Sequence, residues 1–578
     1  MLTLIRKLQS VSGTYARFLW RMVLCNVAKA LFTGVSLVGI GLLIDCVASS
    51  TPPHSDDLVI LIAIMVVSVI GKILFSYQAS RYKNLAAYGM GAENRLLIGD
   101  RLKELNMGYF NSHSLGTIAG GLTTVISNLE NTGFYIIEHS ISGILQTAMM
   151  TICIFIFDWQ TGLLTLAGLL ISVLVNRVSQ KKIDRLTQGL QDCHLRLDSA
   201  MLEFVQGMGV VKAFGKGKQA FSKIRKSIAE NRKESYAIEK ALAPVQSLYI
   251  IVLKCFSCLI ILLAVYRFCN QSISLATAMI LTVLSFSAFS SIELAGMMQN
   301  VQGIATKAID TIETMRNLAP MPQGERKDME KGQIEVENIS FSYTKATPVI
   351  RNVTVHIPAG KTTAIVGPSG CGKTTLCHLV ARFWDVNAGR ILIDGTDVRE
   401  YGYDNLLEQI SIIFQDVYLF EDTVRNNICL GRPDATDEQM IEAAKRACCH
   451  DFIMQLPQGY DTVLQEGGKS LSGGERQRIS VARAMLKDAK IVIMDEATAS
   501  VDPENEQKLT QALTELVKGK TAIVIAHRLN TIQTADQILV MQQGQVIEQG
   551  THAQLMAMPG LYREFVNTRN NALKWKLA

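Results

Sequence analysis

The sequence predicts two parts of different fold class: a transmembrane domain of six α-helices in the first half and an α/β domain built around a phosphate loop in the second. Two observations lead to this prediction. The first half holds a series of apolar runs of about 20 residues, the length that spans a bilayer. The second half holds a glycine-rich loop, Gly367 to Thr375, between an apolar strand pattern and a helical pattern.

Length and composition agree with a membrane protein of more than one domain. The chain has 578 residues, more than a single compact core holds, and 48% of them are hydrophobic. We expect a transmembrane domain at residues 1–318, a linker at 319–331, an α/β domain at 332–568 and a C-terminal tail at 569–578. The net charge of +6 is modest and forms no basic stripe, so no nucleic-acid partner is expected. The 12 scattered cysteines imply no disulfide framework.

Each predicted span is an apolar run bounded by polar or charged residues. A helix needs about 20 such residues to cross the hydrocarbon core of a bilayer. The six predicted spans are Phe18–Ile44, Leu58–Tyr77, Phe134–Phe157, Thr161–Val178, Val245–Tyr266 and Ile273–Met298.

The loops between the spans predict their orientation. The connections at residues 48–57 and 158–160 contain no Lys or Arg, whereas those at 81–131 and 176–243 are rich in both. Because cytosolic loops carry the excess of Lys and Arg, both long loops and both termini are predicted in the cytosol. We expect a multi-pass protein of a bacterial cytoplasmic (inner) membrane, in contact with the lipid bilayer.

The two long loops are predicted to be helical extensions of the spans. No proline occurs between Pro53 and Pro244, and amphipathic, charged sequence such as Lys181–Leu186 continues past the apolar runs. An extension of about 30 residues would project about 45 Å from the bilayer. A solvated helix face alone does not explain this length, whereas contact with a cytosolic domain does.

Several ionisable residues fall in or near the spans. Such groups are costly in lipid, so they usually face a cavity or a partner, or reach the membrane surface. Lys254 and Glu293 lie deepest, where a role in the substrate pathway competes with structural pairing. The residues are Lys29, Asp45, Lys72, Glu138, His139, Lys254 and Glu293.

The phosphate loop matches the pattern G-x-x-x-x-G-K-[ST]. Its glycines let backbone N–H groups surround a phosphate at a helix N-terminus. Lys373 is expected to reach the β- and γ-phosphates of a nucleotide, and the hydroxyl of Thr374 to bind Mg²⁺. The candidate nucleotide-binding residues of this loop are Gly367, Ser369, Gly370, Cys371, Gly372, Lys373, Thr374 and Thr375.

Other residues of the second half suit nucleotide chemistry. Tyr343 lies upstream of the loop, where its ring can stack on adenine. Gln415 follows an apolar strand pattern and is a candidate to sense Mg²⁺ or the attacking water. Asp495 and Glu496 end another such pattern, where Asp495 suits Mg²⁺ and Glu496 suits polarisation of the attacking water. His527 is placed to contact the γ-phosphate, with a buried structural histidine as the alternative.

The stretch Leu471–Gln477, L-S-G-G-E-R-Q, narrows the class of protein. It resembles the signature motif of ATP-binding cassette (ABC) transporters, and the resemblance covers essentially the whole chain. It implies that Ser472, Gly473 and Gly474 bind nucleotide, as does Asp502. The motifs in order are Tyr343 (A-loop), Gly367–Thr375 (Walker A), Gln415 (Q-loop), Leu471–Gln477 (signature), Asp495-Glu496 (Walker B), Ser500-Val501-Asp502 (D-loop) and His527 (H-loop).

The resemblance implies an ATP-hydrolysing half-transporter, because the chain has one cassette and six spans. Two cassettes would dimerise head to tail, with each ATP and its Mg²⁺ between the Walker A motif of one chain and the signature motif of the other. The partner is expected to be a second half-transporter. A related chain is favoured over an identical one.

The membrane half resembles the exporter-type fold of the same family. Asn106–Asn111 and Gly207–Phe214 are similar to segments near two intracellular coupling helices, which dock on the cassettes in that fold. Gln465–Gly468 resembles the X-loop that touches those helices. It departs from the common T-E-V-G-E form, which is compatible with a specialised subgroup.

The cargo is expected to be a small amphipathic solute. Glu203–Met208, Gln465–Gly468 and Val546–Leu555 are similar to siderophore transporters of the yersiniabactin type, so import of a metal–siderophore complex is the first expectation. The alternative is export of lipids, hydrophobic drugs or peptides. An ATP-regulated channel or receptor is disfavoured, because Glu496 and His527 are both intact.

Overall fold

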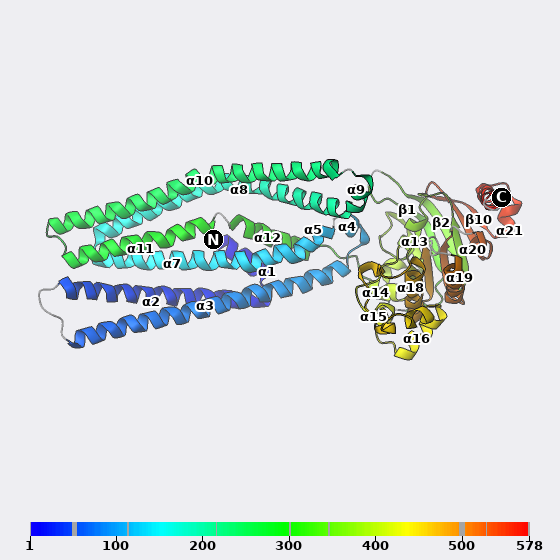
Figure 1. The fold of residues 1–578 in the computed structure, drawn as a ribbon, viewed down its shortest axis with the longest axis horizontal. Coiled ribbons are helices and arrows are strands. Elements are labelled where there is room, and N and C mark those ends of the chain that lie inside the picture. Colours follow the sequence, from blue (N-terminus) through cyan, green and yellow to red (C-terminus); the bar gives the residue numbers. More distant parts are fainter. Residues whose placement is uncertain are drawn as a thin grey trace. The chain divides into compact units, whose positions relative to one another are not determined.

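The structure, a computed structural model, describes residues 2–48, 55–112, 115–215, 217–299, 302–326, 328–344, 347–495, 503–526 and 529–575. The chain forms two compact units (Figure 1). The membrane unit comprises Met1–Lys103 and His113–Ala319. The cassette unit comprises Glu104–Ser112 and Pro320–Ala578, so a short piece of the first long loop groups with the second half of the chain.

In the membrane unit, the described residues form helices. Six of these helices are long and apolar enough to cross a membrane, which confirms the six predicted spans. The helices are α1 (Leu2–Val11), η1 (Gly13–Tyr15), α2 (Ala16–Ala48), α3 (Ser55–Lys103), α5 (Leu115–Gly120), η2 (Gly121–Val125), α6 (Ile126–Asn128), η3 (Leu129–Gly133), α7 (Phe134–Phe157), α8 (Trp159–Gln206), α9 (Met208–Phe214), α10 (Gly217–Cys269), α11 (Leu275–Gln299) and α12 (Gln302–Arg316).

Three helices are much longer than a bilayer is thick, as the sequence predicts. Helices α3, α8 and α10 have 49, 48 and 53 residues. At 1.5 Å per residue each is about 70–80 Å long, against about 30 Å for the hydrocarbon core. Within the unit, α2 lies beside α3, α8 beside α10 and α7 beside α11 (Figure 1).

The helix that leads into the third span departs from regular α geometry. Two π-helical turns, η2 and η3, precede α7. Each π turn closes its hydrogen bond one residue later than an α turn, which changes the face that the next residues present. In η3 the buried Glu130 accepts two hydrogen bonds from the Arg95 guanidinium of α3, at 2.7 and 3.0 Å. The sequence pattern does not predict these turns.

The cassette unit contains two sheets. A six-stranded sheet has the order β10-β9-β3-β8-β7-β6 and is parallel except for β10. A four-stranded antiparallel sheet has the order β2-β1-β4-β5. The strands are β1 (Ile334–Phe341), β2 (Ile350–Ile357), β3 (Thr362–Val366), β4 (Ala388–Ile393), β5 (Thr396–Asp397), β6 (Ile410–Ile413), β7 (Ile491–Asp495), β8 (Thr521–Ile525), β9 (Gln537–Gln542) and β10 (Gln545–Gly550).

The five parallel strands of the six-stranded sheet are buried on both faces, which explains their continuous apolar sequences. Successive side chains of a strand point to opposite faces. Ile365 and Ile493 face a core shared with the antiparallel sheet. Their neighbours Ala364 and Val492 face a second core, made with the helices. The strand ends therefore lie between two packed layers.

The helices of the cassette unit connect these strands, and one of them comes from the first long loop. They are α4 (Met107–Ser112), α13 (Lys373–Val380), η4 (Val398–Glu400), α14 (Tyr403–Glu408), α15 (Val424–Cys429), α16 (Asp437–Arg446), α17 (His450–Met454), η5 (Gly459–Asp461), η6 (Glu466–Gly468), α18 (Gly473–Lys487), α19 (Pro503–Val517), α20 (Leu529–Gln533), α21 (His552–Ala557) and α22 (Leu561–Trp575).

Candidate functional sites

The phosphate loop connects β3 to α13, as predicted. Gly367, Gly370 and Gly372 all have positive φ, at 153°, 78° and 105°. L-residues with a side chain rarely adopt these angles, so glycine is required for the loop's path. A Cβ atom on Gly367 would also clash with the carbonyl of Met541, and one on Gly372 would lie 2.8 Å from Cδ1 of Ile350. The loop therefore runs close to its neighbours as it enters α13.

Lys373 is a buried cation at the start of α13, only 7% exposed. Its ammonium donates hydrogen bonds to the carbonyl oxygens of Gly367 at 3.0 Å and Pro368 at 2.9 Å. Among the described residues, no carboxylate forms an ion pair with it. A buried charge is costly without an opposite charge. The arrangement therefore fits an anionic ligand in the loop, such as the phosphates of a nucleotide.

Tyr343 lies against the same helix. Its hydroxyl is 3.0 Å from Oγ1 of Thr375 in the first turns of α13. The Tyr343 side chain is 46% exposed, so part of its ring remains open to a ligand. The structure thus brings together a candidate base-stacking ring and the phosphate loop.

Asp495 ends β7 close to α13. Its carboxylate interacts electrostatically with Cys377 and His378 on that helix. Burial, and then the charge of Asp495, raise the pKa of the Cys377 thiol. Burial lowers the pKa of His378, and Asp495 partly opposes this. The structure therefore places a carboxylate next to the helix that begins at the phosphate loop.

A magnesium site shared with phosphate fits these residues. Thr374 is exposed in the first turn of α13, and Asp495 is half-buried at the end of β7. In the described part of the chain, no three His, Cys, Asp or Glu side chains gather into a cage for a metal ion. Mg²⁺ usually takes one or two protein oxygens and completes its shell with phosphate and water. A threonine hydroxyl and one carboxylate match that need.

Gln415 lies just after β6, in an exposed loop that begins at Phe414. The Phe414 ring stacks on Phe383 with centroids 6.4 Å apart and an angle of 12°. Because Phe383 follows α13, this stacking ties the Gln415 loop to the nucleotide region of the cassette.

The signature stretch starts helix α18. Ser472 is the N-cap, and it forms a capping box with Glu475: Ser472 Oγ accepts from the Glu475 N–H at 3.3 Å, and Glu475 Oε2 accepts from the Ser472 N–H at 2.8 Å. Gly473 and Gly474 are the first two residues of the helix, whose N–H groups have no partner within the helix itself. The start of a helix of this length attracts anions through its N–H groups and dipole.

Three parts of the predicted site lie outside the described residues. They are the catalytic candidates Glu496 and His527, and Asp502 with its neighbours in the D-loop. Their roles stay predictions from the sequence.

Both expected coupling segments form short helices. Helix α4 groups with the cassette: the N–H of Met107 donates to the carbonyl of Phe383 at 3.1 Å, and the N–H of Met321 donates to the carbonyl of Glu104 at 2.9 Å. Helix α9 belongs to the membrane unit, and its Val210 and Phe214 are 64% and 73% exposed. Such exposed apolar side chains beyond the apolar runs suit contact with another protein surface.

A cluster of charges lies among α2, α3 and α7 in the membrane unit. The Glu138 side chain is 9% exposed and pairs with Lys83 at 2.9 Å. Lys29 lies close enough to Glu138 and to Lys72 to interact electrostatically. His139 is near the same group. Among the described residues of this cluster, Lys83 and Lys29 lie near the carboxylate of Glu138 and Lys72 lies near Lys29, so lysines outnumber carboxylates three to one.

Lys254 and Glu293 form an ion pair at 2.8 Å between α10 and α11. Of the two interpretations open from the sequence, structural pairing is the one that this contact supports. The side chain of Asp45 lies outside the described residues.

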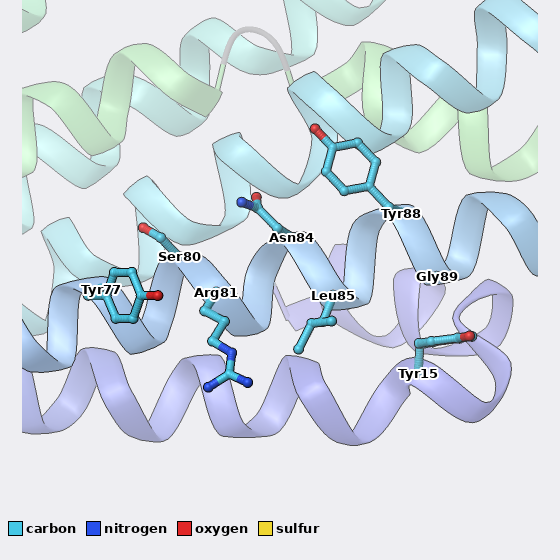
Figure 2. A pocket seen from close by; sticks show the side chains of 8 residues that line it. All are labelled: Tyr15, Tyr77, Ser80, Arg81, Asn84, Leu85, Tyr88 and Gly89. Carbon is cyan, nitrogen blue, oxygen red and sulfur yellow. The ribbon is translucent and has the colours of Figure 1, made fainter.

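A cavity of about 650 Å³ lies on α3 where its apolar run ends. Figure 2 shows Arg81 and Leu85 pointing from α3 toward α2, and Ser80, Asn84 and Tyr88 pointing the other way. The hydroxyl of Ser80 also lies 3.4 Å from Glu138, so the cavity borders the charge cluster. The lining residues are Tyr15, Tyr77, Ser80, Arg81, Asn84, Leu85, Tyr88 and Gly89.

Lys83 and the aromatic pair Phe383 and Trp384 were not predicted from the sequence. Lys83 lies six positions past the predicted end of its span at Tyr77, so it was not counted among the membrane charges. Phe383 and Trp384 carry no motif. Their position directly after the phosphate-loop helix was the one feature of the sequence that could have marked them as part of the nucleotide region.

Two family profiles match the chain: "ABC transporter transmembrane region" at residues 19–292 and "ABC transporter" at residues 350–499. The chain is 34% identical over 485 residues to an "ATP-dependent lipid A-core flippase" of Syntrophus aciditrophicus, covering 82% of this chain and 79% of that protein. It is 32% identical over 498 residues to a "Fatty acid ABC transporter ATP-binding/permease protein" of Mycobacterium bovis, covering 85% and 78%.

Among solved structures, a bacterial Atm1-family ABC exporter with ATP bound has the same fold, with a TM-score of 0.85 at 22% identity. The match covers 96% of this chain and 99% of that one. The predicted fold class is thus confirmed. None of these relatives is described as a siderophore importer, so the expected similarity to the yersiniabactin type gains no support from them.

Proposed function

The chain belongs to the ABC transporter family, and we propose that it moves an amphipathic lipid with an anionic headgroup outward across the bacterial inner membrane. As an ATP-driven half-transporter it hydrolyses ATP to drive transport, and it works as a dimer in the bilayer. The cargo class, the direction, and the cytosolic location of both termini are the proposed parts.

The observation that carries the cargo proposal is the charge cluster on α2, α3 and α7. Lys29, Lys72 and Lys83 outnumber the carboxylate of Glu138 within membrane-spanning helices. Charged groups in such segments are expensive, and they mark substrate pathways when they face a cavity. Lys72 is exposed at its position on α3. An anionic headgroup would supply the missing negative charge, while its acyl chains would remain in apolar surroundings.

The named relatives agree with this cargo class. One is described as a lipid A-core flippase and another as a fatty acid transporter. Their cargoes combine a negatively charged or polar head with hydrocarbon chains. These names favour lipid export over import of a metal–siderophore complex, which becomes the second outcome of the tests below.

The proposed ATP site uses residues of two chains. In one chain, Tyr343 stacks on adenine, while Lys373 and the N–H groups of the loop hold the phosphates. Mg²⁺, held by Thr374, Gln415 and Asp495, would neutralise charge on the phosphates. From the partner come Ser472, Gly473, Gly474 and Asp502. Glu496 polarises the attacking water, and His527 contacts the γ-phosphate.

The proposed coupling is a shift between two states. ATP binds preferentially to the state with closed cassettes, so it shifts the population toward that state. The long helices α3, α8 and α10 run without interruption from apolar to charged sequence, so they can carry the shift to the spans. Hydrolysis at Glu496 returns the transporter to the first state.

The cargo proposal is tested by lipid-stimulated ATP hydrolysis of the purified chain in nanodiscs. We expect phosphatidylglycerol to stimulate hydrolysis more than phosphatidylcholine does, because its phosphate is not balanced by a headgroup cation. The variant Lys72→Gln removes one charge without breaking the Lys83–Glu138 pair, and should reduce this preference severalfold.

The matched control is Lys103→Gln, at the last residue of α3. The Lys103 side chain is 77% exposed and pairs with Asp100 on the same helix, outside the charge cluster. Equal stimulation by both lipids, or an equal loss in both variants, would argue against the headgroup site. Stimulation by an iron–siderophore complex instead would favour import.

A further inference from the structure

A set of aromatic contacts in the cassette unit connects the proposed base site to helix α4. The ring of Tyr343 meets that of Trp384 edge-on, with centroids 5.2 Å apart at 81°. Phe341 backs Tyr343 in the same way, at 5.0 Å and 85°. Edge-to-face pairs at such distances are favourable and have a defined geometry. The position of Tyr343 is therefore coupled to that of Trp384.

Trp384 also lies against α4. A Cβ atom added to Gly108 would lie 3.0 Å from Nε1 of Trp384, which is too close without movement. A side chain at this position would require the indole to shift by a few tenths of an ångström. The N–H of Met107 donates to the carbonyl of Phe383, the residue before Trp384, at 3.1 Å. Helix α4 is thus held by Phe383 and lies directly against Trp384.

The same pair of residues also contacts the Gln415 loop. Phe383 stacks on Phe414, which precedes Gln415. His378, on the phosphate-loop helix, lies 5.4 Å from Phe383 and 5.6 Å from Trp384 between ring centroids. Phe383 and Trp384 therefore stand at the meeting point of the base site, the phosphate-loop helix, the Gln415 loop and α4.

We propose that Trp384 is a positioning residue that passes occupancy of the base site at Tyr343 to α4. A base stacked on Tyr343 restricts that ring, the restricted ring holds the Trp384 indole, and the indole fixes the backbone of α4 at Gly108. Because α4 lies in the chain between α3 and α5, its position then acts on two helices of the membrane unit. The inference uses the proposed role of Tyr343 and is independent of the cargo.

This proposal distinguishes the base of the nucleotide from its phosphates. Tripolyphosphate can occupy the phosphate loop but has no base to place on Tyr343. If Trp384 only fills space in the core, α4 should respond to both ligands or to neither. If Trp384 transmits base binding, α4 should respond to ATP alone.

The test is hydrogen exchange of the full-length chain in nanodiscs, without Mg²⁺ to prevent hydrolysis. Exchange of residues 104–112 reports α4, and exchange of residues 367–375 reports phosphate binding in the same sample. In the wild type we expect saturating ATP to slow exchange in both segments, and tripolyphosphate to slow it only in the phosphate loop. In Trp384→Ala, ATP should still protect the phosphate loop, while protection of α4 should fall at least threefold. Trp384→Phe, which keeps an aromatic ring, should retain part of it.

Equal ATP-dependent protection of α4 in the wild type and in Trp384→Ala would overturn the proposal, as would equal protection of α4 by tripolyphosphate. A wild type whose phosphate loop is not protected by ATP would instead contradict the proposed nucleotide site, so the two failures can be told apart.

A second variant changes α4 instead of Trp384, and it tests the proposal if Trp384→Ala does not fold. Gly108→Leu pushes α4 away from Trp384. We expect ATP still to protect its phosphate loop from hydrogen exchange, while ATP-dependent protection of α4 falls at least threefold. The control is Gly99→Leu in α3, where an added Cβ meets open space. Full ATP-dependent protection of α4 in Gly108→Leu, or the same loss in both variants, would also overturn the proposal.

Discussion

The ammonium of Lys83 lies 2.9 Å from Oε2 of Glu138, an ion pair between α3 and α7 in which the carboxylate is 9% exposed. The pair is flanked by Ser80, by the ring of Tyr135 and by Lys29. A carboxylate this well buried needs a partner, because an isolated buried charge is very costly. Lys83 is that partner, so Lys29 and Lys72 are left as the cations available to a ligand.

Removal of Lys83 alone should therefore harm stability more than removal of both charges. We expect Lys83→Met to lower stability by about 3 kcal/mol, since it leaves Glu138 buried and unpaired. The double variant Lys83→Met/Glu138→Gln should recover most of this loss. Thermal unfolding in nanodiscs measures both. Additive effects of the two substitutions would show that the pair is not coupled.

The phosphate loop predicts a strong effect of Lys373. Lys373→Ala should reduce ATP hydrolysis by about 100-fold or more, the loss seen when one preorganised group that stabilises a developing charge is removed. The control is Lys518→Ala, an exposed lysine of the cassette that pairs with Glu515. Hydrolysis in Lys373→Ala within a few-fold of the wild type would contradict the assignment of the loop.

The proposed ATP site spans two chains, which a mixing experiment can test. Lys373→Ala and Ser472→Ala chains should each be inactive as dimers, because both sites lack a component. A mixed dimer keeps one site with an intact loop and an intact signature motif. Co-expression of differently tagged chains should therefore restore part of the ATP hydrolysis. A mixed dimer as inactive as its parents, with its assembly verified through the two tags, would argue against a site shared in this way.

The catalytic role of Glu496 is a prediction from the sequence. Glu496→Gln should bind ATP but hydrolyse it very slowly, because an amide cannot polarise the attacking water as a carboxylate does. Nucleotide binding and single-turnover hydrolysis measure the two steps. Near-normal turnover would show that a residue other than Glu496 polarises the attacking water.

A carboxylate that is not part of the proposed ATP site should make the cassette sensitive to acid. Asp394 accepts hydrogen bonds from the backbone N–H groups of residues 330 to 333, at 2.8 to 3.0 Å. These bonds hold the segment that leads into β1. The donors are Glu330, Lys331, Gly332 and Gln333. Burial raises the pKa of Asp394, but the four hydrogen bonds outweigh burial and lower it. Asp394→Asn should cost about 1–3 kcal/mol of stability near neutral pH.

The pH dependence of this effect has a defined sign. Because the pKa of Asp394 is lower in the folded state, its contribution is present above the unfolded pKa of about 3.9 and is lost as pH falls through the folded value. The difference in Tm between wild type and Asp394→Asn should thus be constant from about pH 7 to about pH 5 and shrink below about pH 4. A difference that grows on acidification would contradict this explanation.

Much of the fold could be predicted from the sequence because its signals are local. A span is recognised by the length of its apolar run, and α3, α8 and α10 show the predicted extensions. The phosphate loop depends on glycines at fixed spacing, and their positive φ angles explain that spacing. The alternation of apolar strands with helices predicts a mostly parallel sheet, and in the cassette unit five of the six strands of the larger sheet are parallel.

The remaining features depend on residues far apart in the chain, which no local pattern reveals. Gly108 and Trp384 meet only because α4 groups with the cassette unit. Lys83 pairs with Glu138 although it lies outside the predicted span. The π turns before α7 cannot be predicted from the hydropathy pattern. The cargo was also beyond local signals, and similarity in a few short segments pointed to siderophores where longer matches point to lipids.

The direction of transport is tested most directly with the chain reconstituted in liposomes, where added ATP reaches only the molecules whose cassettes face outward. The vesicles carry a fluorescent phosphatidylglycerol in the outer leaflet, which corresponds to the cytosolic leaflet for those molecules. Lipid export predicts that ATP moves the label to the inner leaflet and protects it from dithionite, and that Lys373→Ala abolishes this. No lipid movement, together with ATP-dependent release of an iron–siderophore complex from the vesicle interior, would contradict lipid export and establish import.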